Sequence, residues 1–284
     1  MIYAIIVIFN SNPKKIYNLI EALIGSGVIP VVVDNASIIS TNLKCKTITL
    51  DDNYGIAKAQ NIGVDYVLSQ KPSAVIFFDQ DSVITDSNFI DKLYRPILNN
   101  NAKITAPIFI DNVKGFTYPI VEITMNGGRV KHYPSITSDV FFVNNVISSG
   151  TMVEVGALKD IGKMLEPLFI DYVDTEWCLR ADKKGFKVLI VPSARMFHSI
   201  GDKTLKIGRF YVPKHSPSRR YYRIRNSFYL LRLKHIPKLM AIREITFSVI
   251  HQSILILFSD GERLQYLRNL IKGCKDGVMG HFNK

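Results

Sequence analysis

The chain has 284 residues, of which 47% are hydrophobic and 21% charged, so it can bury one large core and is not an intrinsically disordered chain. Its three cysteines, Cys45, Cys178 and Cys274, lie far apart. Their odd number and spacing fit neither a disulfide framework nor a zinc cluster, which predicts a reducing cytoplasmic environment.

The net charge of +12 is concentrated in the C-terminal part of the chain. Residues 201–284 carry 17 Lys and Arg against 5 Asp and Glu, whereas residues 1–200 carry 19 of each. This shift in composition predicts a boundary near residue 200. It also predicts that the basic extension faces an anionic partner.

The N-terminal region reads as a βαβ unit. Residues 3–9 and 30–34 are apolar runs typical of buried strands. Between them, Asn12 and Pro13 form an N-cap and a favoured first helical residue, which predicts a helix to about residue 24. The run at 3–9 is too short for a signal peptide or a membrane span. It also lacks the basic residue that precedes the apolar part of a signal peptide. Two strands that are apolar throughout predict a parallel sheet covered by helices on both faces.

A glycine-containing segment and a pair of acids follow. Gly55 permits a tight loop, and a helix is expected from there to about Ser69, with small side chains that allow close packing. Residues 75–78 then predict a buried strand that ends in Asp79 and Asp81. Two acids one residue apart can bind Mg²⁺ or Mn²⁺ together with substrate phosphates. The alternative is that they form a turn and cap a helix.

The middle of the chain changes from parallel to antiparallel character. A capped helix after Asp86 and a strand over 103–110 come first, and residues 121–133 then alternate around Asn126-Gly127, which predicts a hairpin. Strands are also expected over 140–143 and 147–153.

Three acids gather at the start of a helix expected from residue 169 and closed by Gly185. Asp171 and Asp174 have a spacing similar to that of a capping box, and Glu176 can pair with Arg180 on the next turn. Capping explains part of this pattern, and a catalytic carboxylate explains the rest. A strand over 187–192 precedes His198, which is either a metal ligand or a half-buried histidine.

These segments together resemble the inverting glycosyltransferases of the GT-A family 2, and most of all their bacterial rhamnosyltransferase branch. The resemblance covers residues 3 to about 230. It rests on the order of Phe9-Asn10, Val33 to Ser37, the Asn53 to Gly63 pattern, Asp79-Gln80-Asp81, Ser149-Gly150, Asp174-x-Glu176-x-Cys178-Leu179-Arg180 and His198.

The resemblance implies a fold and a division of the chain. It implies an α/β, Rossmann-like fold with a mostly parallel central sheet flanked by helices, a small antiparallel excursion and a C-terminal helical tail. Residues 1–200 would be the catalytic domain, with a nucleotide-sugar half at about 1–110 and an acceptor half at about 111–200. Residues 201–284 would be a basic, mainly helical extension.

The resemblance also implies roles for single residues. Asp34 would read the nucleotide base, Asp81 would bind Mg²⁺ or Mn²⁺ on the donor diphosphate, and Asp174 would be the general base. Because Val173 stands where many members have Glu, Asp171 is a rival for the base. Asp79 and His198 would complete the metal site, and further donor contacts would come from Asn10, Asn35, Asn53, Gly55, Lys58, Asn61, Asp79 and Arg225.

The implied reaction is transfer of L-rhamnose from dTDP-β-L-rhamnose to a polyprenyl-diphosphate-linked oligosaccharide, in the synthesis of a bacterial surface polysaccharide such as an O-antigen. Another nucleotide sugar, a UDP-hexose, is the alternative. Residues 75–84 are also close to the first motif of haloacid-dehalogenase-like phosphatases, but here a βαβ unit precedes it. A nucleic-acid binder, suggested by the basic and aromatic residues 219–226, would leave residues 1–200 without a purpose, so no nucleic-acid partner is expected.

The basic extension fits a membrane surface. Arg219, Arg220, Arg223 and Arg225 precede an apolar-rich helix at 241–258, and a basic amphipathic tail can lie on anionic lipid. The protein is therefore expected at the inner face of the bacterial cytoplasmic membrane. The alternative is that the extension is a helical cap on the catalytic domain.

Overall fold

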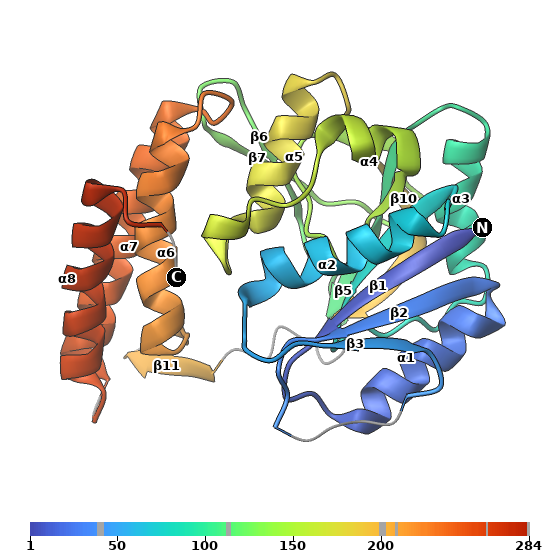
Figure 1. Ribbon diagram of the computed structural model, residues 1–284. Helices are drawn as coiled ribbons and strands as arrows, with labels where there is room; N and C mark the ends of the chain where they lie inside the picture. The colour runs from blue at the N-terminus through green and yellow to red at the C-terminus, as the bar shows by residue number, and fades with distance from the viewer. Residues whose placement is uncertain (39–42, 112–114, 199–202, 208–209, 260, 283–284) are drawn as a thin grey trace.

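A computed structural model describes residues 1–38, 43–111, 115–198, 203–207, 210–259 and 261–282. Its centre is an eight-stranded sheet with the order β3-β2-β1-β4-β9-β5-β10-β8 (Figure 1). The strands are β1 (Ile2–Ile8), β2 (Val28–Asp34), β3 (Lys46–Thr49), β4 (Ala74–Asp79), β5 (Ile104–Asp111), β8 (Phe141–Val143), β9 (Met152–Glu154) and β10 (Val188–His198). The first four are parallel, and β9 runs antiparallel to both of its neighbours.

Helices cover both faces of the sheet, as the continuous apolar strands predict. On one face, α1 (Pro13–Gly25) and α3 (Phe89–Leu98) bury their apolar sides against the sheet. On the other face lie α2 (Gly55–Ser69), α4 (Val155–Ile161) and α5 (Val173–Lys183). The N-cap prediction for α1 is confirmed, since Asn12 Oδ1 accepts a hydrogen bond from the Lys14 amide at 3.0 Å.

The order of the strands fixes where a ligand can bind. The chain runs outward from β1 to β2 and β3, and then returns to place β4 on the other side of β1. Ligands of such sheets bind at the carboxyl ends of the strands on either side of this reversal. Val7 of β1 is the register partner of Asp79, and Ile8 is the register partner of Asp34, so both acids flank the end of β1.

Two expectations about the middle of the chain change. Residues 147–153 were expected to form one strand, but β9 begins only at Met152, because Thr151 and Gly150 turn toward Phe77 and Gly150 has a φ of +74°. The sequence pattern also gave no indication of β3, which is a short and half-exposed edge strand. The predicted hairpin is confirmed as β6 (Ile120–Ile123) and β7 (Arg129–His132).

The C-terminal extension folds against the rest of the protein. A short antiparallel pair, β11 (Lys203–Ile207) and β12 (Phe210–Lys214), leads into α6 (Pro217–Arg232), α7 (Lys238–Phe258) and α8 (Arg263–Met279). These helices pack together at the end of the molecule away from α3 (Figure 1). A third apolar cluster, which includes Ile123, Leu179 and Leu230, joins them to β6 and α5. The boundary near residue 200 stays a prediction.

Candidate active site

A cavity of about 590 Å³ opens at the carboxyl ends of β1 and β4. The last residue of β4, Asp79, and Asp81 in the turn after it line the cavity, and the start of α5 contributes Asp174. The segment before α5 contributes Asp171, and α6 contributes Arg219. Residues that are far apart in the sequence therefore meet in one cavity, and four of its acids are those singled out in the sequence.

The backbone around Asp79 is held by serine hydroxyls. Ser149 Oγ accepts a hydrogen bond from the Asp79 amide at 3.2 Å and lies 2.7 Å from Ser82 Oγ. Gly150 donates its amide to the Phe77 carbonyl oxygen at 2.7 Å, with a φ of +74° that a residue with a Cβ rarely adopts. The Ser149-Gly150 pair thus fixes the turn in which the two acids sit.

The Asp79 carboxyl is surrounded by other acids. Its pKa is raised to about 7, first by burial and then by the charges of Asp174 and Asp81, while Arg219 acts in the opposite direction. A carboxyl that is costly to ionise alone becomes favourable to ionise beside a cation. Two carboxylates at a strand end, with more negative than positive charge around them, are suitable ligands for a hard divalent cation. Among the described residues, no group of three His, Cys, Asp or Glu side chains is placed to hold a metal ion.

Asp174 lies in the first turn of α5, with its side chain facing the cavity. Its pKa is raised to about 6, mainly by burial and also by the charge of Asp171. Hydrogen bonds from the backbone and side chain of Ser148 act in the opposite direction and lower the pKa. A carboxyl with a pKa near the working pH is suited to take up a proton and release it again.

Asp171 was expected to cap α5, and that expectation is wrong. The N-cap residue is Tyr172, in a left-handed conformation, and no side chain of the described residues caps this end of the helix. The Asp171 carboxylate instead accepts a forked pair of hydrogen bonds from Arg219, at 3.1 and 3.3 Å, and one from Arg223 at 3.4 Å. Its side chain is only 6% exposed. Two guanidinium groups therefore hold the Asp171 carboxylate in place at the edge of the cavity.

Two predicted donor-binding residues, Asn35 and Asn53, line the cavity and shape its loop. Asn35 donates to Asn53 Oδ1 at 3.0 Å and accepts from the Tyr54 amide at 2.9 Å. Asn53 Oδ1 also accepts from the Gly55 amide at 3.0 Å. Gly55 has a φ of +81°, and a Cβ there would lie 2.5 Å from the Phe169 carbonyl oxygen. Gly55 is therefore required by both its conformation and its neighbour.

Three other predicted donor contacts lie outside this cavity. The Asn10 side chain accepts from the Ile38 amide, and the buried Asp34 accepts from the Ser37 amide, each at 2.9 Å. Both stabilise the loop after β2. Asn61 was expected to present its amide group at this loop, and the structure corrects this. Its side chain is buried and bonds to the backbone of Met164 on both sides, at 2.8 and 2.9 Å.

Lys58 and Arg225 line a second cavity of about 540 Å³ beside the first. Phe169 forms a wall of both cavities and stacks on Tyr222 at 4.3 Å between ring centroids. The Arg225 guanidinium is almost fully buried and donates to Asn226 Oδ1 at 2.8 and 3.0 Å. Its other bond, to the Pro167 carbonyl oxygen at 2.5 Å, joins α6 to the segment before α5, so Arg225 does not line the cavity that holds the acids.

The side chain of His198, predicted as a metal ligand, lies outside the part of the chain that the structure describes; its backbone ends β10.

The four arginines at 219–225 were expected to face a membrane, and the structure contradicts this. Arg220 is 1% exposed and donates to the Ser248 carbonyl oxygen at 2.9 Å. Arg225 is equally buried, and Arg219 and Arg223 both bond to Asp171. Arg219 and Arg223 tie α6 to Asp171, and Arg220 ties it to α7. The position of Arg219 in the cavity was missed because its partner lies 48 residues away in sequence.

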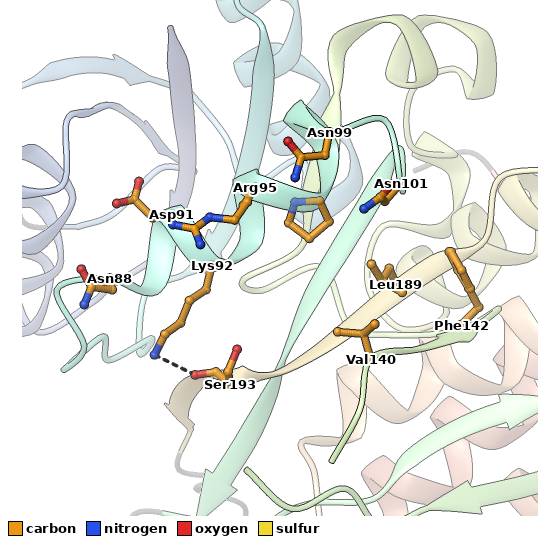
Figure 2. A pocket seen from close by; sticks show the side chains of 11 residues that line it. Asn88, Asp91, Lys92, Arg95, Asn99, Asn101, Val140, Phe142, Leu189 and Ser193 are labelled. Carbon is orange, nitrogen blue, oxygen red and sulfur yellow. Dashed lines mark hydrogen bonds between the residues drawn. The ribbon is translucent and has the colours of Figure 1, made fainter. Parts of the chain in front are cut away.

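A larger cavity, of about 660 Å³, lies elsewhere. Figure 2 shows it between α3 and the strand β10, with Lys92 bonded to the Ser193 carbonyl oxygen at 3.1 Å. Among the described residues, Asp91 is the one acid that lines it, so it has no paired carboxylates there. The smaller cavity at the strand ends is therefore the better candidate for chemistry.

Comparisons with known proteins agree with this geometry. The family model for glycosyl transferase family 2 matches residues 3–153. The chain is also 45% identical over 287 residues to the dTDP-rhamnosyl transferase RfbF of Shigella flexneri, covering 98% of this chain and 96% of that one. The chain belongs to glycosyltransferase family 2. The matched residues include Asp79 and Asp81. The extent of both matches confirms the predicted family and enzyme class.

Solved structures of glycosyltransferases share the fold. TarS from S. aureus has a TM-score of 0.58 at 17% identity, over 99% of this chain and 50% of that one. The mannosyltransferase PcManGT from Pyrobaculum calidifontis, in complex with GDP-Man and Mn²⁺, has a TM-score of 0.55 at 10% identity, over 98% and 87%. GalNAc-T7 with UDP, GalNAc and Mn²⁺ has a TM-score of 0.55 at 14% identity, over 91% and 58%. The predicted GT-A fold class is confirmed.

Proposed function

We propose that this protein is an inverting, metal-dependent rhamnosyltransferase that uses dTDP-β-L-rhamnose as its donor. One observation carries the proposal: Asp79, Asp81 and Asp174 meet in a single cavity at the carboxyl ends of β1 and β4. The near full-length similarity to a dTDP-rhamnosyl transferase supports the choice of donor. A UDP-hexose remains the competing donor.

Asp81 and Asp79 would hold Mg²⁺ or Mn²⁺, and structural relatives bound to Mn²⁺ and nucleotides support a divalent ion. When bound, the cation neutralises charge that develops on the leaving diphosphate. Arg219 lies in the same cavity and adds a fixed positive charge, which Asp171 holds in place through two hydrogen bonds. Asn35 and Asn53, which line the same cavity, would position the nucleotide.

Asp174 would take the proton from the acceptor hydroxyl group. The acceptor oxygen then bonds to the anomeric carbon while the bond from that carbon to the diphosphate oxygen breaks. The products are the rhamnoside and dTDP, and the proton on Asp174 passes to solvent. A single displacement inverts the anomeric configuration, so a β-linked donor gives an α-L-rhamnoside.

The acceptor would be a polyprenyl-diphosphate-linked oligosaccharide at the inner face of the bacterial cytoplasmic membrane. The bacterial relative and the basic, apolar-rich C-terminal extension support this assignment.

A donor screen tests the proposal. Purified protein with Mn²⁺ or Mg²⁺ is assayed for release of nucleotide diphosphate from each common nucleotide sugar. Release from dTDP-rhamnose well above that from UDP-hexoses is expected. A clear preference for a UDP-hexose would replace the donor assignment, and phosphate release through a phosphoryl-enzyme on Asp79 would favour a phosphatase.

A further inference from the structure

Helix α7 buries a stripe of polar side chains and exposes large apolar ones. Its buried positions include Glu244, Ser248 and Gln252, which recur every four residues and form one stripe. On the opposite side, Ile250 is 50% exposed and Leu257 is 64% exposed. A surface helix of a globular protein normally has the reverse arrangement. The outer side of α7 therefore suits a non-aqueous neighbour.

The polar stripe is held inside the protein by hydrogen bonds. Glu244 accepts from Arg129 at 2.6 Å and from Tyr172 at 3.1 Å. Gln252 donates to the Tyr266 carbonyl oxygen of α8 at 2.9 Å. Turning α7 to bury its apolar side would break these contacts and leave Glu244 unpaired, so the helix is fixed with its apolar side outward.

Helix α8 also exposes an apolar stripe, and it adds positive charge. Gly273 and Gly277 pack against α6 so closely that a Cβ on either would clash with Ile224 or Phe228. On the far side, Leu264, Leu267, Ile271 and Val278 are exposed at helical spacing. We call these side chains, together with the exposed apolar side chains of α7, the α7–α8 face.

The charges on these two helices are almost all basic. Glu244 and Asp276 are their acids, and both bond inside the protein, Asp276 to the Tyr221 hydroxyl group at 2.7 Å. Arg268, Lys272 and Lys275 are exposed beside the apolar stripe of α8. An apolar stripe edged by Lys and Arg is the pattern of a helix that lies in the headgroup region of anionic lipid.

We propose that the α7–α8 face binds an anionic lipid bilayer and holds the protein flat on it. A second copy of this chain fits less well, because a symmetric contact would bring the same basic residues toward one another. Within the described residues, α7 is the one helix long and apolar enough to cross a membrane by length and composition. Its buried polar stripe keeps it against α6 and α8, so it lies along the surface.

The position of this face relative to the active site supports lipid as the partner. A cavity of about 440 Å³ is lined by Phe247 and Ile250 of α7 and by Arg223 of α6. Arg223 bonds to Asp171, which lines the catalytic cavity. A bilayer on the α7–α8 face therefore lies close to the catalytic cavity. The inference rests on the proposed function in one respect: membrane binding would bring the enzyme to a lipid-linked acceptor.

Flotation with vesicles tests the proposal without donor or acceptor. The full-length protein should float with vesicles of phosphatidylglycerol and phosphatidylethanolamine, and about 0.5 M salt should weaken the binding. The variant Phe247→Ser/Ile250→Ser/Leu257→Ser should lose about tenfold or more of its binding, because it removes large apolar side chains from the face. The variant Arg268→Gln/Lys275→Gln should bind neutral vesicles as before and anionic vesicles less.

Leu98→Ser is the matched control, because Leu98 on α3 is 65% exposed, against 64% for Leu257. It should float like the wild type. Circular dichroism and urea unfolding, unchanged in the triple variant, show that the variant is folded. Unchanged flotation of the triple variant would overturn the proposal. So would a dimer that forms without lipid and that the triple variant abolishes. Failure of the donor screen would instead refute the proposed function alone.

Discussion

Substitution of Asp171 and of Asp174 by Asn should change stability and activity in opposite ways. The Asp171 side chain is 6% exposed and bonds to two arginines whose side chains are 39% and 31% exposed. Asp171→Asn removes the anion that both guanidinium groups share. Fully buried pairs cost about 3–5 kcal/mol when broken, and exposed pairs cost less than about 1 kcal/mol. This pair lies between those limits, so we expect a loss of about 1–3 kcal/mol, or roughly 2–10 °C in Tm.

Asp174→Asn should leave stability unchanged or raise it at pH 8. The pKa of Asp174 in the folded protein is about 6, above its ordinary value of 3.8. Above pH 6 the carboxylate is ionised at a cost in the folded state, and Asn removes that cost; below the unfolded pKa both states are protonated and the difference vanishes. Turnover should fall by about 10² to 10⁴, the usual contribution of a general base.

Urea unfolding and initial-rate assays on both variants distinguish the two roles. The pair Asp171→Asn/Arg219→Gln gives a double-mutant cycle in which the combined loss of stability should be smaller than the sum of the single losses. Asp171 would be the base, and our assignment wrong, if Asp171→Asn abolished turnover with unchanged stability while Asp174→Asn did the reverse. Additive losses in the cycle would show that the ion pair has no energetic weight.

Three further predictions concern the cation, pH and the loop at Gly55. Asp81→Asn keeps the size of the side chain and loses its charge, so turnover should collapse while circular dichroism stays unchanged; full activity of this variant in EDTA would refute a metal role. The kcat of the wild type should rise with pH through an apparent pKa of about 6, because Asp174 must lose its proton, and a pH profile of kcat that is flat from pH 5 to 8 would contradict this. Gly55→Ala should cost about 2–4 kcal/mol, since it adds a positive-φ penalty to a clash with Phe169, whereas Gly27→Ala, with a φ of +72° and no atom within 4 Å, should cost about 1 kcal/mol. Equal losses of stability in urea for the two glycine variants would show that the contact with Phe169 does not matter.

The acids that line the cavity could be singled out from the sequence because the signals were local. Apolar runs mark β1, β2 and β4, and in a parallel sheet their carboxyl ends meet at one edge. This pattern alone predicts that Asp34 and Asp79 lie near each other, and the structure places them on either side of the end of β1. Asp174 was found through the cluster of acids at the start of α5.

The remaining features depend on contacts between distant parts of the chain. Asp171 appeared to be a helix cap because its arginine partners come about 50 residues later, on α6. Asn61 appeared to be a donor ligand because its partner Met164 lies 103 residues away. The composition of α7 predicted an apolar helix, but which side faces outward is set by the hydrogen bonds of Glu244 and Gln252. No local pattern contains that information.

The central claim is tested most directly by the anomeric configuration of the product. The enzyme with Mn²⁺, dTDP-β-L-rhamnose and a lipid-linked acceptor should give an α-L-rhamnoside by NMR, together with one dTDP for each sugar transferred. Removing the cation or replacing Asp174 by Asn should stop its formation. A β-L-rhamnoside, or transfer that survives in EDTA, would contradict a single displacement assisted by a cation at Asp79 and Asp81.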